Sequence, residues 1–331
     1  MPVDDNCDVH GEAGVAAAGS PEPTNQLPAV DNSRNVPIQI VKPMYHVEGG
    51  SQSASTSPVD PAGTTTVLES GIAGDFTPVD PDEMMNIRRQ QDEIEQETKQ
   101  QPLVTPKLPM ATLVEKYSEG SQFRQKAIEL AELYKHIQFI RRDGNCFYRA
   151  ILSALFDTLS KDEALFNRFF EHSKGWFKRI VDLGYTEFTA SDICEHFTDA
   201  LEAVKEGERE LRYLIVDLTN DATSNYYVSF LRLITAGLLR EREDDFSPFL
   251  SEYSSMKDFC EHEVEPMWRE ADHLAIVGLS HALNLSIRVE YLDQNAAPDG
   301  RSFYNFIVDG DEEPKLVVLF TPGHYDVLYK E

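Results

Sequence analysis

The sequence carries little positive charge for its size. Its 331 residues include 57 Asp and Glu against 30 Lys and Arg, which gives a formal net charge of −27 at pH 7. Proteins that bind nucleic acid or anionic membranes need a basic surface. The composition therefore argues against both as partners and suits a basic protein partner instead.

Cysteines are also few, and long hydrophobic runs are missing. Cys7, Cys146, Cys194 and Cys260 are scattered, with no Cys-x-x-Cys pair, as is typical of reduced intracellular thiols. No apolar stretch approaches the ~20 residues that span a bilayer, and the N-terminus lacks the basic-then-apolar pattern of a signal peptide. We therefore expect a cytoplasmic protein, with the nucleus as a second location.

Motifs for metal and nucleotide binding are lacking as well. Cys-Glu-His triplets occur at 194–196 and 260–262, but neither has a second pair at zinc spacing. On a helix, moreover, the Cys and His of such a triplet point to different faces. There is no P-loop and no Gly-x-Gly-x-x-Gly. We expect no metal and no organic cofactor.

What the sequence does contain divides it into three parts. Residues 1–80 are rich in Ala, Gly, Ser, Thr, Pro and Asp without a sustained hydrophobic period, which predicts a disordered tail. Residues 81–101 place Met84, Met85 and Ile87 on a narrow apolar stripe of an otherwise charged helix. This helix either docks on its own domain or folds on a partner. Residues 102–331 form the third part, a domain with sustained hydrophobic periodicity.

Within that domain, helical periodicity comes first and strand periodicity last. The order predicts an α+β fold that ends in a meander of strands, which pair with the Ile137 strand or with each other. Thr189–Asp192 and Ser224–Asn225 are the expected starts of two helices. The expected helices cover 122–136, 146–159, 165–183, 189–204, 211–218, 224–239 and 272–282, and the expected strands cover 137–140, 285–291, 303–308, 316–320 and 324–329.

A tight polar turn, Arg142–Cys146, joins the strand at 137–140 to a buried helix. Cys146 stands in the first helical turn, where free N–H groups and the positive end of the helix dipole favour a thiolate and can hold an oxyanion. Gly144 allows the tight turn, and Asn145 is expected to cap the helix. A lone cysteine is more often a small core residue, so the nucleophile hypothesis needs a histidine elsewhere.

His324 is that histidine. It begins the last expected strand, directly after a Thr-Pro-Gly turn. Residues i and i+2 of a strand point to the same face, so Asp326 can accept the imidazole N–H. Cys146, His324 and Asp326 would then serve as nucleophile, base and orienting acid.

The two motifs together resemble the catalytic motifs of ovarian-tumour (OTU) domain cysteine proteases, and of the otubains in particular. The motifs are Asp143–Ala150 and Pro322–Tyr329, and the resemblance runs from about Met84 to Lys330. It implies a papain-like fold, in which a helix-rich subdomain packs on a small, mostly antiparallel sheet. We also expect a monomer. Further similar segments are 226–239, 263–268, 271–276 and 289–293.

The resemblance implies a deubiquitinase that cleaves the bond after the C-terminal glycine of ubiquitin, in polyubiquitin chains that target proteins to the proteasome. Cys146 is then the nucleophile, His324 the general base and Asp326 its orienting acid. Asp143 also corresponds to a catalytic residue of the family, and the sequence leaves open whether Asp143 or Asp326 orients the histidine. We expect Asp143 to shape the loop near the oxyanion hole, and residues near Tyr325 to line the channel for the ubiquitin tail.

Two other functions stay open. Proteins similar to this one inhibit ubiquitin-conjugating enzymes without using the cysteine, and in that interpretation the helix at 81–101 contacts the donor ubiquitin. A third interpretation is a peptidase for a ubiquitin-like modifier.

Overall fold

The computed structural model describes residues 98–250, 252–293, 303–308 and 313–331, together with 85, 89 and 96. The predicted tail at 1–80 lies outside the described residues, as does most of the stretch 81–97. Within that stretch, the described residues 85, 89 and 96 are helical, and so are 98–100. Among the described helices, none combines the length and the apolar character needed to cross a bilayer.

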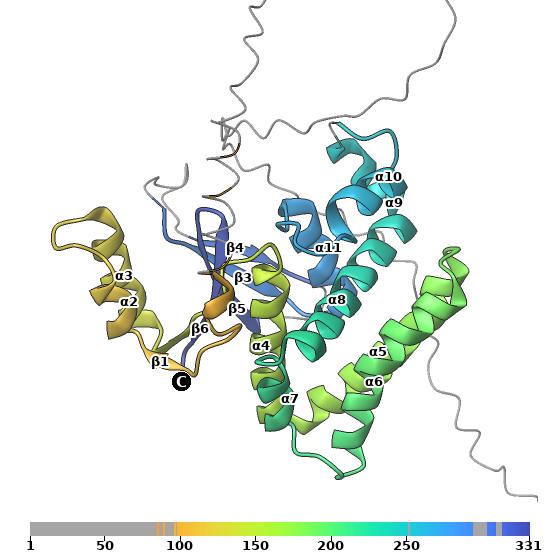
Figure 1. Cartoon of the computed structure of the whole chain (residues 1–331), viewed down its shortest axis with the longest axis horizontal. Helices are drawn as coiled ribbons and strands as arrows, with labels where there is room; N and C mark the ends of the chain where they lie inside the picture. Colours follow the sequence, from red (N-terminus) through yellow and green to blue (C-terminus); the bar gives the residue numbers. More distant parts are fainter. Residues whose placement is uncertain are drawn as a thin grey trace, which may run out of the picture. The chain divides into compact units, whose positions relative to one another are not determined.

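The described strands form one six-stranded sheet in the order β1-β2-β6-β5-β3-β4 (Figure 1). Neighbours are antiparallel except β3 and β5, which are parallel, so the mostly antiparallel sheet is confirmed. The predicted meander is wrong, because β4 lies at the edge and the chain then crosses to the far side of β3. The bounds are β1 Leu108–Pro109, β2 His136–Gln138, β3 Ile287–Tyr291, β4 Phe303–Phe306, β5 Leu316–Thr321 and β6 His324–Tyr329.

The predicted helices occur in the predicted order, with two corrected starts and one corrected end. The helix expected over 122–136 ends at Leu133, and the short helix Ala111–Glu115 was not predicted. α6 begins after Thr186, which accepts the Thr189 N–H, and α8 begins after Asn220, which accepts the Thr223 N–H. In both cases the cap lies about one turn earlier than predicted. The bounds are α2 Ala111–Glu115, α3 Gln122–Leu133, α4 Cys146–Lys161, α5 Glu163–Asp182, α6 Glu187–Lys205, α7 Arg212–Asp217, α8 Asp221–Glu241, α9 Glu243–Phe246, a 3-10 turn Ser247–Phe249, α10 Met256–Phe259, a π-helical turn Cys260–Val264 and α11 His273–Leu283.

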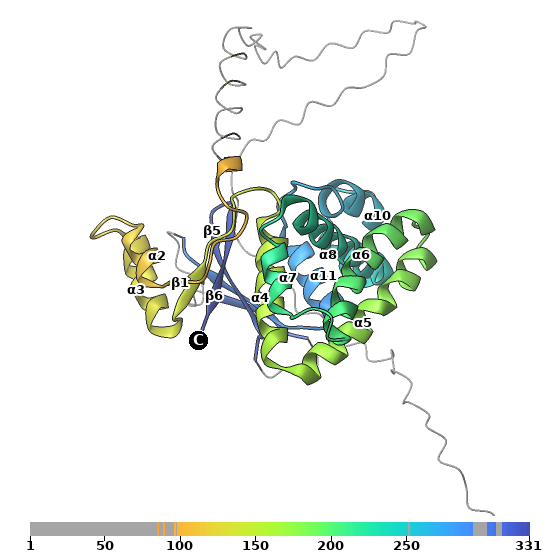
Figure 2. The same ribbon diagram turned by 60° about the horizontal axis from the view of Figure 1, so that its bottom comes forward.

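Figure 2 shows the sheet between two helical layers, with α2 and α3 on one side and α4 on the other. The α2–α3 side is an apolar cluster that joins Leu113 and Leu130 to Val317, Leu319 and Leu328 of the sheet. Because strand residues alternate in direction, His324 and Asp326 lie on the same face of β6 as Leu328. The opposite face carries Tyr325, whose ring packs against Phe147 of α4.

Behind α4, the helices pack around aromatic side chains. The rings of Phe197 and Phe230 stack at 4.1 Å, and Phe156 and Tyr227 pack against Phe197. Trp176 is fully buried and donates its indole N–H to the Ala282 carbonyl at 3.2 Å. This core holds α8 and α11 in direct contact, and α8 in turn reaches the turn that precedes α4.

The contact between α8 and α11 makes a testable prediction about two helical glycines. A Cβ on Gly278 of α11 would lie 2.9 Å from Leu239 Cγ, whereas a Cβ on Gly175 of α5 would meet nothing within 4 Å. We expect Gly278→Ala to destabilise the fold by about 1–3 kcal/mol through overpacking. Gly175→Ala should stabilise it by about 0.5–1 kcal/mol, because Gly is a poor residue in a helix interior.

The measurement is the free energy of unfolding in urea for both variants and the wild type. Equal midpoints for the two variants would contradict the packing derived for Gly278.

Candidate active site

The turn that carries Cys146 closes on itself through its own backbone. The Cys146 N–H donates to the Asp143 carbonyl at 3.0 Å, the Asp143 N–H donates to the Arg141 carbonyl at 2.9 Å, and the Asn145 N–H donates to Asp143 Oδ1 at 3.0 Å. These three N–H groups are therefore engaged inside the turn. They are three of the four N–H groups of the Asp143–Cys146 turn that are expected to form the oxyanion hole.

The Cys146 thiol is buried, with 3% of the residue exposed. Burial raises the pKa of the thiol to about 12, and the carboxylates of Asp143, Glu270 and Asp326 act in the same direction. The Tyr325 backbone lowers the pKa, but by less than burial and the carboxylates raise it. In the free protein these effects oppose the thiolate that the start of α4 is expected to favour, because loss of hydration and nearby negative charges disfavour the charged form.

His324 and Asp326 form the pair that strand alternation predicts. Asp326 Oδ1 lies 2.9 Å from His324 Nε2 and also accepts the Ile140 N–H at 2.9 Å. His324 is 5% exposed and Asp326 is 2% exposed. His324 Nδ1 is buried and has no hydrogen-bond partner. With Nε2 donating to the carboxylate, Nδ1 is the nitrogen left to accept a proton.

Asp143 has other partners. Its two carboxylate oxygens accept Arg149 Nη1 at 2.9 and 3.0 Å, and Arg141 Nε lies 3.2 Å from Oδ2. Together with the Asn145 N–H, these donors tie Asp143 to the base of the turn. The geometry gives Asp326 the contact with the histidine and gives Asp143 the loop-shaping position.

Asn145 holds the N-cap position of α4 but does not cap the helix with its side chain. Its Oδ1 instead accepts the Trp268 N–H at 3.0 Å and Arg232 Nη2 at 2.8 Å. Gly144 is pressed against the same segment, since a Cβ there would lie 1.9 Å from the Trp268 carbonyl oxygen. The stretch around Trp268 therefore backs the catalytic turn, and Gly144 is required for this close approach.

Tyr325, near which the channel lining is expected, is itself buried. It is 7% exposed, and its ring packs between Phe147 and Phe320. What Tyr325 supplies to the site is its backbone N–H. The sequence signal for an exposed aromatic and for a buried one is the same here, because β6 is covered on both faces.

Two arginines of the site escaped the sequence analysis. Arg149 is fully buried, and besides Asp143 its guanidinium reaches Ser224 Oγ, with Nε at 3.0 Å. Arg232 is 1% exposed and binds the turn from α8. Both stand inside otherwise apolar helical runs. A single charged residue in such a run of the sequence is the signal that could have identified them.

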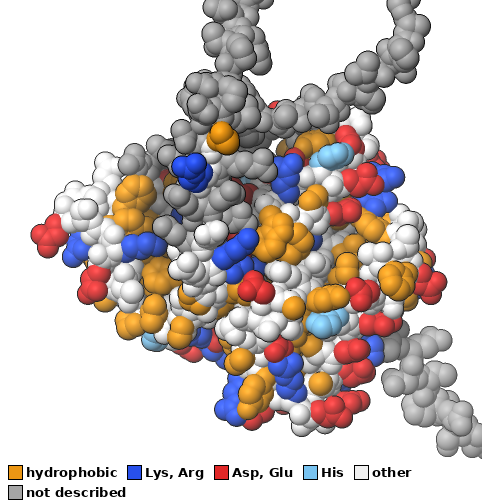
Figure 3. Space-filling model, viewed as in Figure 1, with side chains coloured by type: hydrophobic (Ala, Val, Ile, Leu, Met, Phe, Trp, Pro, Cys, Tyr) orange, Lys and Arg blue, Asp and Glu red, His pale blue; other side chains and the backbone are white. Residues whose placement is uncertain are grey.

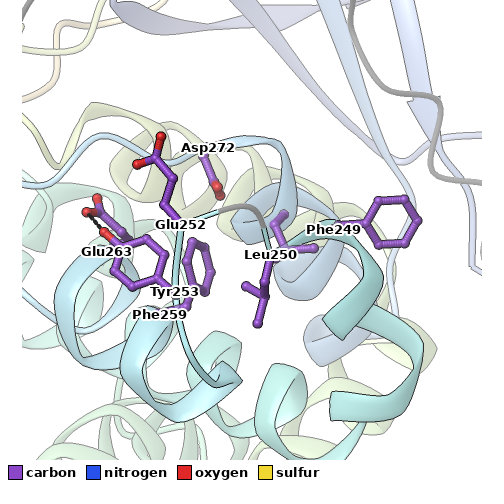
Figure 4. A pocket seen from close by; sticks show the side chains of 8 residues that line it. Phe249, Leu250, Glu252, Tyr253, Phe259, Glu263 and Asp272 are labelled. Carbon is purple, nitrogen blue, oxygen red and sulfur yellow. Dashed lines mark hydrogen bonds between the residues drawn. The ribbon is translucent and has the colours of Figure 1, made fainter.

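A cavity of about 390 Å³ is lined by a different set of residues. Figure 4 shows its side chains, with Tyr253 and Glu263 joined by a hydrogen bond. None of the four predicted catalytic residues lines it. Its lining consists of Phe249, Leu250, Glu252, Tyr253, Phe259, Glu263, Asp272 and Leu274.

Comparison with known proteins agrees with this geometry. A family model described as Peptidase C65 Otubain matches residues 96–330. The ubiquitin thioesterase otubain-like protein of Caenorhabditis briggsae is 43% identical over 255 residues, which cover 75% of this chain and 88% of that protein. Human ubiquitin thioesterase OTUB1 is 38% identical over 246 residues, which cover 74% of this chain and 89% of that protein.

A solved structure gives the same answer for the fold. It is a complex of ceOTUB1 with ubiquitin aldehyde and UBC13~Ub, and it matches with a TM-score of 0.69 at 39% identity, covering 73% of this chain and 99% of that chain. The papain-like fold that the resemblance implied is confirmed. The chain belongs to the otubain family of cysteine-type deubiquitinases.

Proposed function

We propose that this chain is a thiol-dependent isopeptidase that hydrolyses the bond after the C-terminal glycine of ubiquitin, in polyubiquitin chains that target proteins to the proteasome. The observation that carries the proposal is the contact of His324 Nε2 with Asp326 Oδ1 at 2.9 Å. The same oxygen accepts the N–H of Ile140, which precedes the Cys146 turn. The names of the relatives, ubiquitin thioesterases, support the choice of ubiquitin. The preference for proteasome-targeting chains rests on the family resemblance.

The reaction follows from these positions. His324 Nδ1 accepts the thiol proton while the Cys146 sulfur attacks the glycine carbonyl carbon. The resulting oxyanion is held by N–H groups of the Asp143–Cys146 turn. The imidazolium gives its proton to the departing lysine amine as the C–N bond breaks. Water that gives a proton to His324 then attacks the thioester, which releases the ubiquitin carboxylate and restores the thiol.

Asp326 acts on the ring throughout this cycle. It holds the Nε2–H tautomer and stabilises the imidazolium that forms in each half-reaction. The N–H groups of the turn act only after they leave their partners inside it, so substrate binding has to redirect at least part of the turn. The protonated thiol and the closed turn together describe a resting enzyme that becomes aligned when its substrate binds.

Replacement of the nucleophile and of the base makes a prediction about a ubiquitin probe that carries a C-terminal electrophile. We expect the wild type to form a covalent adduct and Cys146→Ala to form none. His324→Ala should slow turnover by about 10²–10⁴-fold, as for loss of a general base. Asp326→Asn should retain more activity than His324→Ala, because the ring stays in place. The measurements are adduct formation by mass spectrometry and turnover of diubiquitin of each linkage.

An adduct only with a ubiquitin-like probe would assign the peptidase to that modifier instead. Equal turnover of all linkages would contradict the preference for proteasome-targeting chains.

The raised pKa of the thiol predicts the pH dependence of alkylation. Because the pKa of Cys146 is about 12, the thiolate fraction in the free protein grows with pH across the whole neutral range. The rate of alkylation by iodoacetamide should therefore rise about tenfold per pH unit, without a plateau near the ordinary thiol pKa of about 8.5. Glu270→Gln should raise the rate at fixed pH, since the Glu270 charge holds the pKa up.

The measurement is the alkylation rate of Cys146 between pH 6 and 9.5, resolved by peptide mass spectrometry. Cys194 is a matched reference, because burial also raises its pKa to about 12. A constant rate between pH 6 and 8 would indicate a preformed thiolate–imidazolium pair and contradict the resting state described above.

A second function is supported by a different observation. Solved structures similar to this chain contain ubiquitin-conjugating enzymes charged with ubiquitin, UBC13~Ub in one and UBCH5B~Ub in another. In this chain, the helical residue Met85 is 61% exposed, α6 exposes Phe188 (86%) and α7 exposes Val216 (57%). Figure 3 shows hydrophobic side chains among the charged ones on the face that it displays. We propose that these apolar side chains contact a charged conjugating enzyme and its ubiquitin, and that this contact inhibits the enzyme without using Cys146.

The two functions separate by mutation. Cys146→Ser should abolish peptidase activity and leave inhibition of ubiquitin transfer intact, because a serine keeps the shape of the site. Deletion of residues 1–101 should abolish inhibition and preserve turnover of a ubiquitin C-terminal amide. Single-round discharge of ubiquitin from the conjugating enzyme measures inhibition, and hydrolysis of a fluorogenic ubiquitin amide measures peptidase activity. Inhibition that survives the deletion would contradict a role for the N-terminal helix.

A further inference from the structure

Arg232 is a buried cation with no carboxylate among its hydrogen-bond partners. It lies in α8 with 1% of its surface exposed, and its guanidinium stacks over the Tyr148 ring at 4.3 Å. Nη1 donates to the Val264 carbonyl at 2.9 Å, and Nη2 lies within reach of three acceptors, all of them carbonyl or amide oxygens. Asp143 is the nearby negative charge but does not bond to Arg232. Burying a cation without a directly bonded opposite charge is costly, so its retention in the core calls for a function.

The acceptors of Arg232 belong to two segments. Gly144 O at 2.9 Å and Asn145 Oδ1 at 2.8 Å belong to the catalytic turn. Val264 O and Arg269 O, the latter at 2.7 Å, belong to the segment 264–269. This segment starts at the last residue of the π-helical turn and precedes α11. One side chain thus ties the turn before Cys146 to the segment that backs it.

The backing segment is itself in a constrained conformation. Trp268 has a φ of 69°, in the left-handed region that is rare for a bulky residue, and it is 53% exposed. Such conformations persist only where the surrounding contacts hold them, and they cluster at functional sites. Here the contacts are the Trp268 N–H on Asn145 Oδ1 and the Trp268 carbonyl against Gly144.

The position of the Gly144 carbonyl matters for the reaction. It lies two residues before the nucleophile, so a rotation of this peptide would present a carbonyl oxygen to the developing oxyanion and repel it. Arg232 Nη2 holds that oxygen toward the protein interior, so the oxygen does not face the oxyanion when substrate binding frees the N–H groups of the turn. Catalytic hydrogen bonds tolerate little displacement, and a misplacement of about 1 Å can cost about 10²-fold in rate.

We propose that Arg232 is a positioning residue for the hydrolysis. It acts through Gly144 and Asn145, without touching substrate, and keeps the turn in the orientation from which the oxyanion hole forms. The proposal rests on the deubiquitinase function proposed above. It makes a specific distinction, because steps that develop an oxyanion depend on Arg232 and steps that only consume the thiol do not.

The test compares Arg232→Met and Arg232→Lys with a matched control, Arg240→Met. Arg240 lies on the same helix, donates to the Leu183 carbonyl at 2.8 Å and covers the Tyr185 ring at 4.5 Å, so it repeats the chemistry of Arg232 away from the turn. For each full-length variant, the measurements are kcat and KM on a fluorogenic ubiquitin amide, affinity for ubiquitin aldehyde, alkylation of Cys146 by iodoacetamide, and the unfolding midpoint.

We expect Arg232→Met to lower kcat and the affinity for ubiquitin aldehyde by about 10²-fold, with KM and alkylation changed less than about twofold. Aldehyde affinity falls because the bound hemithioacetal carries the oxygen that the turn must hold. Arg232→Lys, which keeps the charge and some of the hydrogen bonds, should lose about tenfold in kcat. Arg240→Met should alter only the unfolding midpoint.

A wild-type kcat in folded Arg232→Met, or a parallel loss of kcat and alkylation, would overturn the proposal. If Arg232→Met does not fold, Arg232→Lys decides in the same way: a reduced kcat with unchanged alkylation supports the role, and an unchanged kcat overturns it. Failure of the wild type to bind ubiquitin aldehyde would overturn the proposed function itself, which is a separate result.

Discussion

The pairing of β2 with β6 is the constraint on which the active site depends. It sets His136 opposite Tyr329 and Gln138 opposite Val327, and so joins two stretches near opposite ends of the catalytic domain. Two residues beyond Gln138, the Ile140 N–H reaches Asp326. Because β2 and β6 are antiparallel, β2 ends where β6 begins. The turn with Cys146 and the start of β6 at His324 therefore lie at the same end of these two strands. The β5–β6 pairing positions His324 by itself, but only the β2–β6 pairing brings the His324 strand beside the stretch that leads to Cys146.

The buried charges around the site are balanced in two different ways. Asp143 is neutralised by Arg149 and Arg141, whereas Arg232 binds only carbonyl and amide oxygens. The first arrangement makes a rigid base for the turn. The second leaves a positive charge near a reaction that develops a negative one. The net effect on the resting thiol is nevertheless unfavourable to ionisation, because burial dominates its pKa.

Much of this could be predicted from particular residues. Alternation along 324–329 was enough to pair Asp326 with His324, and the polar turn before an apolar helix was enough to place Cys146 at its start. Helix starts at Thr186 and Asn220 were missed because polar residues one turn later fit the same pattern. The parallel β3–β5 pair was missed because a crossover leaves no local signal. The partners of Asn145 and Arg232 depend on the segment 264–269, which is remote in sequence from both.

The raised pKa of Cys146 also bears on the chemical durability of the protein. Peroxides and other oxidants attack thiolates, and oxidation beyond the sulfenic acid is not readily reversed. A nucleophile that stays protonated and 3% exposed between reactions offers oxidants little to react with. Its sulfur becomes vulnerable mainly during turnover, when substrate occupies the site. The burial that delays catalysis thus preserves the residue on which catalysis depends.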